Sequence, residues 1–382
     1  MKYDDTICCC ALNRIFGFKP MIALALIEEL GSPSAIFELK KKELDRILGP
    51  FIPQKELISD RMYDIAADEI YNFKNNTSFI PWCSPVYPKL LKECQDAPLG
   101  LYIKSTSPAD GVFTDRQFIS IVGTRDISEY GKEWCSKTVD AISRTGNTPT
   151  IVSGLALGTD ITAHKKALEQ GLPTIAVMAT GIDSVYPHRH IETAEEIVQT
   201  PGSALITDYP PGTAPLQINF LRRNRIIAGL SGTTILIESK SKGGGMLTAR
   251  LAFSYSRDVY ALPGRADDIR SAGCNILLRE KTAEPLISEE NLISSLGMKY
   301  IPGQSASDSE QIINSIYSGK SDRIENLTKL LRSVRRHRGI DIEELAEENG
   351  LEYKEALENI SILEADGFIN IDLMQRCFIR RK

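Results

Sequence analysis

The sequence predicts an α/β protein in which helices cover both faces of a mainly parallel sheet, with a small helical region at each end of the chain. Between Phe118 and about Ser288, short apolar and β-branched runs alternate with amphipathic segments of helical length. The runs are continuously apolar, which is typical of parallel strands buried on both faces. They lie at 119–122, 150–152, 174–177, 204–206, 234–237 and 259–262.

The segment before this sheet divides into two parts. Residues 1–75 carry apolar residues at helical spacing, such as Ile22, Leu26 and Leu30, and glycines at the turns, which predicts a helical domain. Such a domain either only packs or binds a nucleic-acid backbone without sequence preference. Residues 76–117 contain five prolines and predict a connector without long helices, leading into the domain at 118–298.

The segment after the sheet has a different pattern. Residues 299–322 are rich in serine and contain Pro302 and Gly303, which predicts a linker. Residues 323–382 then predict three helices, the last two closed by Gly350 and Gly367, and two short strands. Three helices followed by a hairpin are typical of a winged-helix domain, a variant of the helix-turn-helix.

Small residues and glycines follow the predicted strands. In open parallel sheets, ligands bind at the carboxyl ends of the strands, and glycine lets a ligand approach the backbone. The loops at 123–125, 153–158 and 243–248 each precede a helix, whose free N–H groups suit a phosphate. The dinucleotide and ATP-binding fingerprints, Gly-x-Gly-x-x-Gly and Gly-Lys-Ser/Thr, do not occur in these loops.

The segment at 219–225 has the most specific composition, with three arginines and two asparagines in seven residues. Residues 215–250 hold six basic residues and one acid, a local charge of +5. Arginine grips phosphates through paired hydrogen bonds and stacks on bases, so we interpret this segment as an anion site rather than a solvated charged face. His164 has no nucleophile in a suitable motif beside it, so we predict no catalytic residues.

The net charge of −5 conceals two opposite regions. Residues 341–367 contain ten acids and one lysine, a local charge of −9, so the rest of the chain carries +4. Several anion sites along one sheet edge suggest a polyanion, and nucleic acid is the obvious one. Sparse positive charge favours a single strand in a narrow groove over broad coating of a duplex.

The remaining composition argues against other classes of site. The eight cysteines form no Cys-x-x-Cys pair and have no histidine at ligand spacing, so we expect neither a metal nor a cofactor. They are interpreted as small buried residues in a reducing compartment. The longest apolar run, near Met21–Ile27, is too short for a membrane span, and no signal peptide is visible. We therefore expect a cytoplasmic protein without membrane contacts.

Seven motifs in order resemble the DNA-processing protein A family (DprA, also called Smf). They are Ile-Val-Gly-Thr-Arg at 121–125, Ser-Gly-Leu-Ala-x-Gly-x-Asp at 153–160 with Ala163 and His164, Thr-Gly-x-Asp-x-x-Tyr-Pro at 180–187, the segment 219–231, Leu-Thr-Ala-Arg at 247–250, the segment 259–264 and Gly-Cys-Asn at 273–275. The resemblance is strong over about 118–288. It implies an extended Rossmann-like, doubly wound fold with an N-terminal sterile-alpha-motif-like domain and a C-terminal winged helix.

The resemblance also implies a function. Members of this family bind single-stranded DNA, protect incoming DNA in natural transformation, help to load the RecA recombinase and dimerise through the Rossmann-like domain. By position, Arg125 would grip a phosphate, and Arg222, Arg223 and Arg225 would line the same groove. The motifs and the resemblance together give these candidate contacts: Gly123, Thr124, Arg125, Ser153, Gly154, Gly158, Lys165, Arg189, Asn219, Arg222, Arg223, Asn224, Arg225, Gly244, Gly245 and Thr248.

Two positions depart from the family pattern. The family usually has an arginine where Leu157 stands, so one positive contact is expected to be missing. Its Tyr-Pro-Lys-x-Asn motif is replaced here by Tyr-Pro-His-Arg-His at 186–190. The cation at that place is therefore either Arg189 or a protonated His188.

Two other functions can be weighed on the sequence. A nucleotide-processing Rossmann-like enzyme of the phosphoribohydrolase type needs Pro-Gly-Gly-x-Gly-Thr and a downstream Glu, which the segments at 243–250 and 263–265 do not supply. A winged-helix transcription factor needs a basic recognition helix, whereas the helix predicted at 353–365 is acidic. Arginines at 332, 335, 336 and 338 on the preceding helix are the one feature in favour of duplex binding. We expect the winged helix to bind a protein or a second copy of the chain.

Overall fold

The structure is a computed structural model that describes residues 2–17, 19–301, 313, 316–317, 321–337, 339–372 and 375–379. The chain divides into two compact units, Met1–Lys299 and Tyr300–Lys382. Each unit has apolar residues buried in a core of its own. Most of the linker predicted at 299–322 lies outside the described residues.

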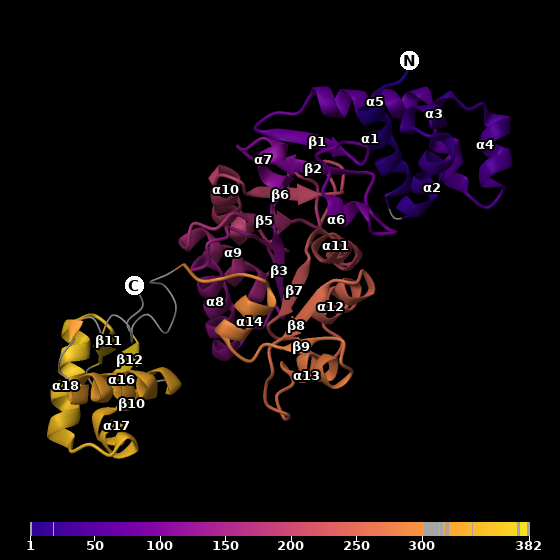
Figure 1. Cartoon of the computed structure of the whole chain (residues 1–382). Helices are drawn as coiled ribbons and strands as arrows, with labels where there is room; N and C mark the ends of the chain where they lie inside the picture. Colours follow the sequence, from indigo (N-terminus) through magenta and orange to yellow (C-terminus); the bar gives the residue numbers. More distant parts are fainter. Residues whose placement is uncertain are drawn as a thin grey trace. The chain divides into compact units, whose positions relative to one another are not determined.

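The described part of the first unit is organised around a nine-stranded sheet in the order β1-β2-β6-β5-β4-β3-β7-β8-β9 (Figure 1). All six predicted strands are present, and they pair in parallel. They are β3 (Phe118–Val122), β4 (Thr150–Ser153), β5 (Thr174–Val177), β6 (Ala204–Thr207), β7 (Thr233–Leu236) and β8 (Asp258–Ala261). A short β9 (Glu284–Pro285) continues the parallel part beside β8. The prediction of an α/β fold with a mainly parallel sheet is therefore confirmed.

The segment 76–117 contributes structure beyond that of a connector. It forms β1 (Thr77–Pro81) and β2 (Gly100–Lys104), which pair antiparallel with each other, and β2 pairs antiparallel with β6. Its helices, α6 (Lys89–Lys92) and α7 (Ala109–Phe113), are short, as the prolines predict. The prolines do not prevent these strands, because Pro81 is the last residue of β1 and Pro98 precedes β2.

Helices cover both faces of the sheet. Figure 1 shows α8 (Glu129–Ser143), α9 (Thr159–Glu169) and α10 (Ile191–Gln199) on one side and α11 (Gln217–Leu230), α12 (Gly244–Ser254) and α13 (Ala272–Arg279) on the other. Val152 and Ile175 from the strands share one buried cluster with Ile226, Ile227 and Ala249 from α11 and α12. The unit ends with α14 (Glu289–Ser295). Helices on both faces explain the continuously apolar strands.

The N-terminal helices belong to the same unit as the sheet. They are α1 (Asp5–Phe16), α2 (Pro20–Leu30), α3 (Pro33–Glu38), α4 (Lys41–Leu48), the 3-10 helix η1 (Pro53–Leu57) and α5 (Asp60–Tyr71). Leu12 and Phe16 of α1 are buried in one cluster with Tyr102 of β2 and Leu205 of β6. The Asn13 amide also donates a 2.7 Å hydrogen bond to the Asp208 carbonyl after β6. These helices therefore cover the apolar face near the antiparallel edge of the sheet.

The second unit has the element order of a winged helix. It contains α16 (Ser321–Arg336), β10 (Ile340–Asp341), α17 (Ile342–Asn349), α18 (Tyr353–Ala365), β11 (Ile369–Ile371) and β12 (Arg376–Ile379). The strands form a sheet in the order β10-β12-β11, so β10 adds one strand to the two predicted. Gly350 and Gly367 follow α17 and α18 with positive φ (66° and 79°), which explains why glycine closes each helix. Leu330, Leu345 and Leu363 are buried in this core.

Within the described ranges, no helix is both long enough and apolar enough to cross a membrane.

Arg225 of α11 forms a buried ion pair that joins three segments of the first unit. Its guanidinium donates to the Asp208 carboxylate at 2.5 Å and to the Asp96 carbonyl. The two side chains are only 11% and 6% exposed. Burial of Asp208 raises the pKa of its carboxyl, and the neighbouring Arg225 opposes that shift. Removing one member would leave the other charge buried without compensation.

We expect Arg225→Met to lower the free energy of unfolding by about 3–5 kcal/mol, because the Asp208 carboxylate would remain buried and unpaired. Denaturant unfolding followed by circular dichroism measures this loss. Arg189→Met is the matched control, since Arg189 is exposed on η2 (His188–His190) and should change the stability by less than about 0.5 kcal/mol. Equal stability of the two variants would contradict this assignment.

The cysteines differ sharply in their environments. All eight are free thiols; seven are buried and Cys83 is exposed. Burial raises the pKa of Cys8 to about 12. The Cys83 sulfur lies 3.9 Å from that of Cys9, and a hydrogen bond between the two thiols lowers the pKa of Cys83. Cys83 is therefore the thiol with the most accessible and most ionisable sulfur.

We expect iodoacetamide to modify Cys83 first in the native protein at pH 8, because the thiolate is the reactive form. Peptide mass spectrometry over a time course identifies the labelled site. Cys83→Ser should remove the fast phase, whereas Cys377→Ser should leave it unchanged. A fast phase that persists in Cys83→Ser would show that another thiol is the reactive one.

Candidate nucleic-acid interface

The loops after β3, β4 and β7 meet at the carboxyl edge of the sheet, where β3 has β4 on one side and β7 on the other. Glycine permits this meeting. A Cβ on Gly123 would lie 2.4 Å from Thr159 Oγ1, and one on Gly245 would lie 3.2 Å from the Gly123 Cα. The loop after β3 is thus enclosed between the starts of α9 and α12. This is the point in a doubly wound sheet at which ligands bind.

The start of α9 packs against the loop 123–125 and fixes its backbone. Gly158, which caps α9, has a φ of +74°, and a Cβ there would lie 2.3 Å from the Thr124 carbonyl oxygen. The Thr159 N–H donates to that same carbonyl at 3.1 Å. Because Thr124 is held in this way, Arg125 extends to the surface, where its side chain is exposed.

Arg223 of α11 lies buried beneath the edge of the sheet. Its side chain is 3% exposed, and Nη1 donates a 2.6 Å hydrogen bond to the Val177 carbonyl at the end of β5. The guanidinium occupies the space over Gly154, where a Cβ would lie only 1.7 Å from Nη1. Its Nε has no hydrogen-bond partner among the described residues. This residue is a fixed positive charge with unsatisfied donor capacity.

The electrostatics around Arg223 follow from its burial. Desolvation lowers the pKa of Arg223 to about 10, the Asp160 carboxylate acts in the opposite direction, and the nearby Arg125 lowers it further. Burial also raises the pKa of Asp160. At neutral pH, Arg223 remains protonated. Arg125 and Arg223 therefore repel each other, and an anion bound between them would relieve that repulsion.

Arg125, Tyr186 and Phe220 form a cluster at this edge, which we call the Arg125 platform. Arg125 and Tyr186 are exposed, and Phe220 is half-buried. The Arg125 guanidinium carbon lies 5.0 Å from the centre of the Phe220 ring. The rings of Tyr186 and Phe220 are 5.5 Å apart and inclined by 62°. Tyr186 is 47% exposed, and Arg125 has no ion-pair partner in the described part of the chain. An exposed ring and a half-buried one beside this guanidinium suit the bases and phosphates of a single strand.

Sequence reasoning did not single out Tyr186 or Phe220 as site residues. Phe220 stands between Asn219 and Arg222 in the basic segment, and Tyr186 belongs to a motif that was considered only for its cation. Interleaving of an aromatic with arginines was the available signal. The contact between Tyr186 and Phe220, which are 34 positions apart, follows from the fold alone.

The start of α12 lies beside α11. The Asn224 amide donates to the Gly244 carbonyl at 3.3 Å, and Gly244 is exposed while Gly245 is buried. Gly243 caps the helix without a side-chain hydrogen bond. The first N–H groups of α12 thus lie next to the loop after β3 and remain unpaired within the helix.

Several predicted contacts point into the protein. Arg225, expected in the groove, is instead held by Asp208 within the fold, so its charge is already neutralised. Asn219, which was expected beside it, is buried and donates to the Ala214 carbonyl at 3.1 Å. Ser153 is buried and donates to the Ile121 carbonyl at 2.6 Å, and Thr248 donates to the Gly244 carbonyl of its own helix. These side chains hold the loops in place and do not face solvent.

The other predicted cations differ in exposure. Lys165 on α9 and Arg189 on η2 are exposed and have no ion-pair partner among the described residues, whereas Arg222 is half-buried. His188 is exposed beside Arg189, so both candidates for that cationic position reach solvent. Leu157, at the position where an arginine is usual, is half-buried in the loop before α9.

His164 occupies a position unsuited to acid–base chemistry in this groove. It is completely buried, and its Nδ1 lies 2.8 Å from Thr174 Oγ1. Burial lowers its pKa to about 3, so the ring is neutral at physiological pH. Among the described residues, no three acidic, histidine or cysteine side chains are grouped as a metal site would require.

Comparison with known sequences identifies close relatives. A family model described as DNA recombination-mediator protein A matches residues 78–297. Protein Smf of Escherichia coli is 32% identical over 316 residues, which cover 80% of each chain. Protein Smf of Synechocystis is 37% identical over 224 residues, 59% of this chain, and the match spans only 55% of that relative's length.

Two solved structures resemble this fold. DNA processing protein A from Streptococcus pneumoniae has a TM-score of 0.61 and 29% identity, covering 73% of this chain and 92% of its own. DNA processing protein A from Helicobacter pylori, whose structure concerns its binding of single-stranded DNA, has a TM-score of 0.51 and 30% identity, covering 58% and 95%. The family model spans β1 to α14, the whole of the sheet that forms this edge. The chain therefore belongs to the DNA recombination-mediator protein A family.

Proposed function

We propose that this chain binds single-stranded DNA along the carboxyl edge of its sheet, protects that DNA in the cytoplasm during natural transformation and passes it to a RecA recombinase. The observation that carries the proposal is the Arg125 platform. There the exposed Arg125, which has no ion-pair partner among the described residues, and the exposed Tyr186 adjoin the half-buried Phe220, and the buried Arg223 is close to Arg125. The family description as a recombination mediator supports the later steps.

The geometry of the site favours a single strand over a duplex. Rings at the surface can stack only on bases that have left their own stack, and every base offers such a face. At this edge only Arg125, Lys165 and Arg189 are exposed cations that we assign to the DNA, whereas a duplex-coating protein spreads many cations over a broad face. In this proposal Arg125 holds a phosphate, Tyr186 and Phe220 stack on bases, and Arg223 supplies fixed positive potential from below.

The proposal extends to partners. At this edge Gly244 is exposed and Gly123 is half-buried, and the exposed Lys165 and Arg189 would extend the positive surface. A dimer formed through the Rossmann-like domain would place two such edges on one strand, as the family resemblance implies. The relative from Helicobacter pylori, described by its single-stranded DNA binding mode, supports the choice of ligand.

We infer that the winged helix does not supply the DNA contact. The outward sides of α17 and α18 expose glutamates, among them Glu343, Glu347, Glu355 and Glu358. A recognition helix with this charge is repelled by phosphate, so a basic protein surface or another copy of the chain is the better partner.

We expect Arg125→Ala to weaken binding to a labelled oligothymidylate roughly tenfold and to make the slope of log affinity against log salt shallower by about 0.7, since one phosphate contact is lost. Tyr186→Ala should weaken binding by a similar factor without changing that slope, because stacking releases no counterions. Fluorescence anisotropy at several salt concentrations measures both quantities. Mobility shifts with single- and double-stranded DNA, with and without recombinase, test the choice of ligand and the handover.

Arg46→Ala and Tyr186→Phe are the matched controls for this experiment. Arg46 is an exposed arginine of α4, and Tyr186→Phe keeps the stacking ring, so both should bind like the wild type. If Arg125→Ala and Tyr186→Ala bind as tightly as the controls, the groove assignment is wrong.

We also expect truncation after Lys299, the end of the first compact unit, to leave duplex affinity unchanged at 0.15 M salt. The reason is that the acidic helices α17 and α18 add no attraction for phosphate. Anisotropy with a labelled duplex compares the truncated and full chains. A clear fall in duplex affinity on truncation would assign DNA binding to the winged helix.

A further inference from the structure

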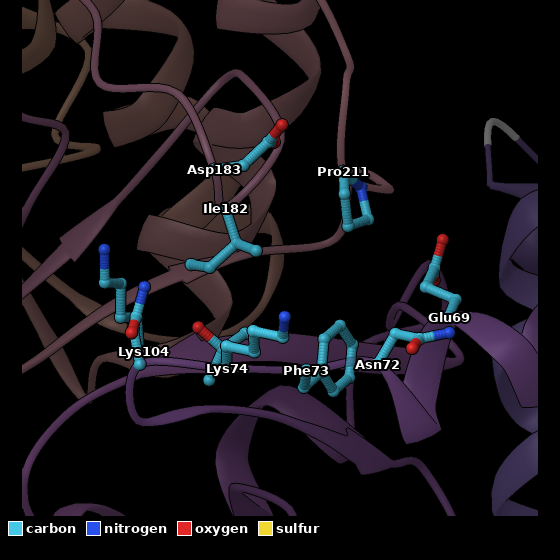
Figure 2. Close-up of a pocket in the computed structure, with 10 residues that line it drawn as sticks. Glu69, Asn72, Phe73, Lys74, Lys104, Ile182, Asp183 and Pro211 are labelled. Atoms are coloured by element: carbon cyan, nitrogen blue, oxygen red, sulfur yellow. The ribbon is translucent and has the colours of Figure 1, made fainter.

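Besides the edge that carries the Arg125 platform, a hollow lined by two lysines lies between the N-terminal helices and the loops of the sheet. It has a volume of about 430 Å³ and is formed by the end of α5, the ends of β1 and β2, and the loops after β5 and β6. Figure 2 shows Phe73, Lys74 and Lys104 on one side of it and Ile182, Asp183 and Pro211 on the other. No function described above uses these residues.

The charges around this hollow are not balanced. Glu69 accepts a 2.6 Å hydrogen bond from the Tyr102 hydroxyl and forms an ion pair with Arg14. The Asp183 carboxylate accepts the Gly212 N–H at 2.9 and 3.0 Å. The Glu69 charge is thus paired with Arg14, whereas Asp183 keeps its negative charge at the edge of the hollow.

Neither lysine of the hollow is neutralised. Lys74 is exposed and Lys104 is half-buried, and neither has an ion-pair partner in the described ranges. Lys74 and Lys104 outnumber Asp183, the one lining carboxylate without an ion-pair partner in the described ranges, so the lining is net positive and attracts a phosphate. Each ammonium is a compact point charge with three donors.

The remaining walls suit a base or a sugar. Phe73, Ile182 and Pro211 supply apolar surface, and Phe73 is held edge-on by the Tyr102 ring at 6.1 Å. The volume lies within the range of small-molecule sites, about 300–1,000 Å³. A hollow with apolar walls and two lysines on its rim matches one nucleotide unit, with its phosphate outside and its base inside.

The hollow is close to the Arg125 platform along the chain. Asp183 at its edge and Tyr186 of the platform belong to one loop and are three residues apart, which limits their Cα separation to about 11 Å. A strand that stacks on Tyr186 therefore passes within about two nucleotides of the edge of the hollow.

We propose that this hollow binds a further nucleotide of the same single strand, with its phosphate on Lys74 and Lys104 and its base against Phe73 and Ile182. This inference rests on the function proposed above. It makes the N-terminal helices part of the DNA-binding surface and predicts a longer binding site than the Arg125 platform alone provides. A free mononucleotide shares the same chemistry, and the experiment separates the two sources.

The test measures affinity for oligothymidylates of increasing length, for the full chain and for the double variant Lys74→Ala/Lys104→Ala. The wild-type affinity should rise with length to a plateau. The double variant should reach its plateau at a shorter length, bind the longest oligomer about tenfold more weakly at 0.1 M salt, and show a salt slope shallower by about 0.7 for that oligomer only, since one phosphate contact is lost. Lys74→Arg/Lys104→Arg should restore the wild-type plateau.

Lys42→Ala, which removes an exposed lysine of α4 without touching the hollow, is the matched control and should behave like the wild type. Equal affinities of the double variant and the wild type at every length, while Arg125→Ala weakens binding, would overturn this inference alone. An equal loss at every length would also overturn it, as would saturable binding of thymidine monophosphate that the double variant loses without any effect of length. No effect of Arg125→Ala would overturn the proposed function instead.

Discussion

The close contact between the Arg223 guanidinium and Gly154 is the constraint on which the carboxyl edge depends. The guanidinium occupies the space that any larger side chain at 154 would fill, and its hydrogen bond to the Val177 carbonyl ties α11 to the end of β5. A buried cation is costly to place, and Asp160 and the β5 carbonyl compensate it only in part. The loops above it are therefore shaped around a positive charge that cannot move away. That fixed charge, with the exposed Arg125 nearby, is the reason we propose that this edge binds an anion.

Helix geometry places the three arginines of α11 in three different environments. Successive residues are rotated by about 100° around a helix, so neighbours in sequence face different surroundings. Arg222 stays half-buried near the surface, Arg223 lies under the sheet edge, and Arg225 turns to Asp208 on another side. Three arginines that are clustered in the sequence thus have different roles in the fold. Arg225 forms an ion pair, Arg223 is a buried positive charge, and Arg222 is partly exposed.

Much of the fold could be predicted, because the strands buried on both faces leave continuous apolar runs with glycines at their ends. β1 and β2 were missed because the prolines near their borders resemble those of a connector, although β2 contains no proline and β1 has one only at its last position. For the site, the loop glycines and Arg125 could be found from local pattern. The inward orientation of Asn219 and Arg225 could not, since it depends on distant groups such as Asp208. The edge-to-face contact of Tyr186 with Phe220 likewise depends on tertiary structure.

The attachment of α1 to the sheet has an evolutionary consequence. Leu12 and Phe16 bury the same face as Tyr102 and Leu205, and Asn13 satisfies the Asp208 carbonyl beside the Arg225 ion pair. The helical region is thus not a module that can be exchanged freely. A lineage that lost it would have to replace apolar residues on β2 and β6 and find a new donor for that carbonyl. Among relatives that retain both parts, we therefore expect positions in α1 to covary with the positions of β2 and β6 that they contact.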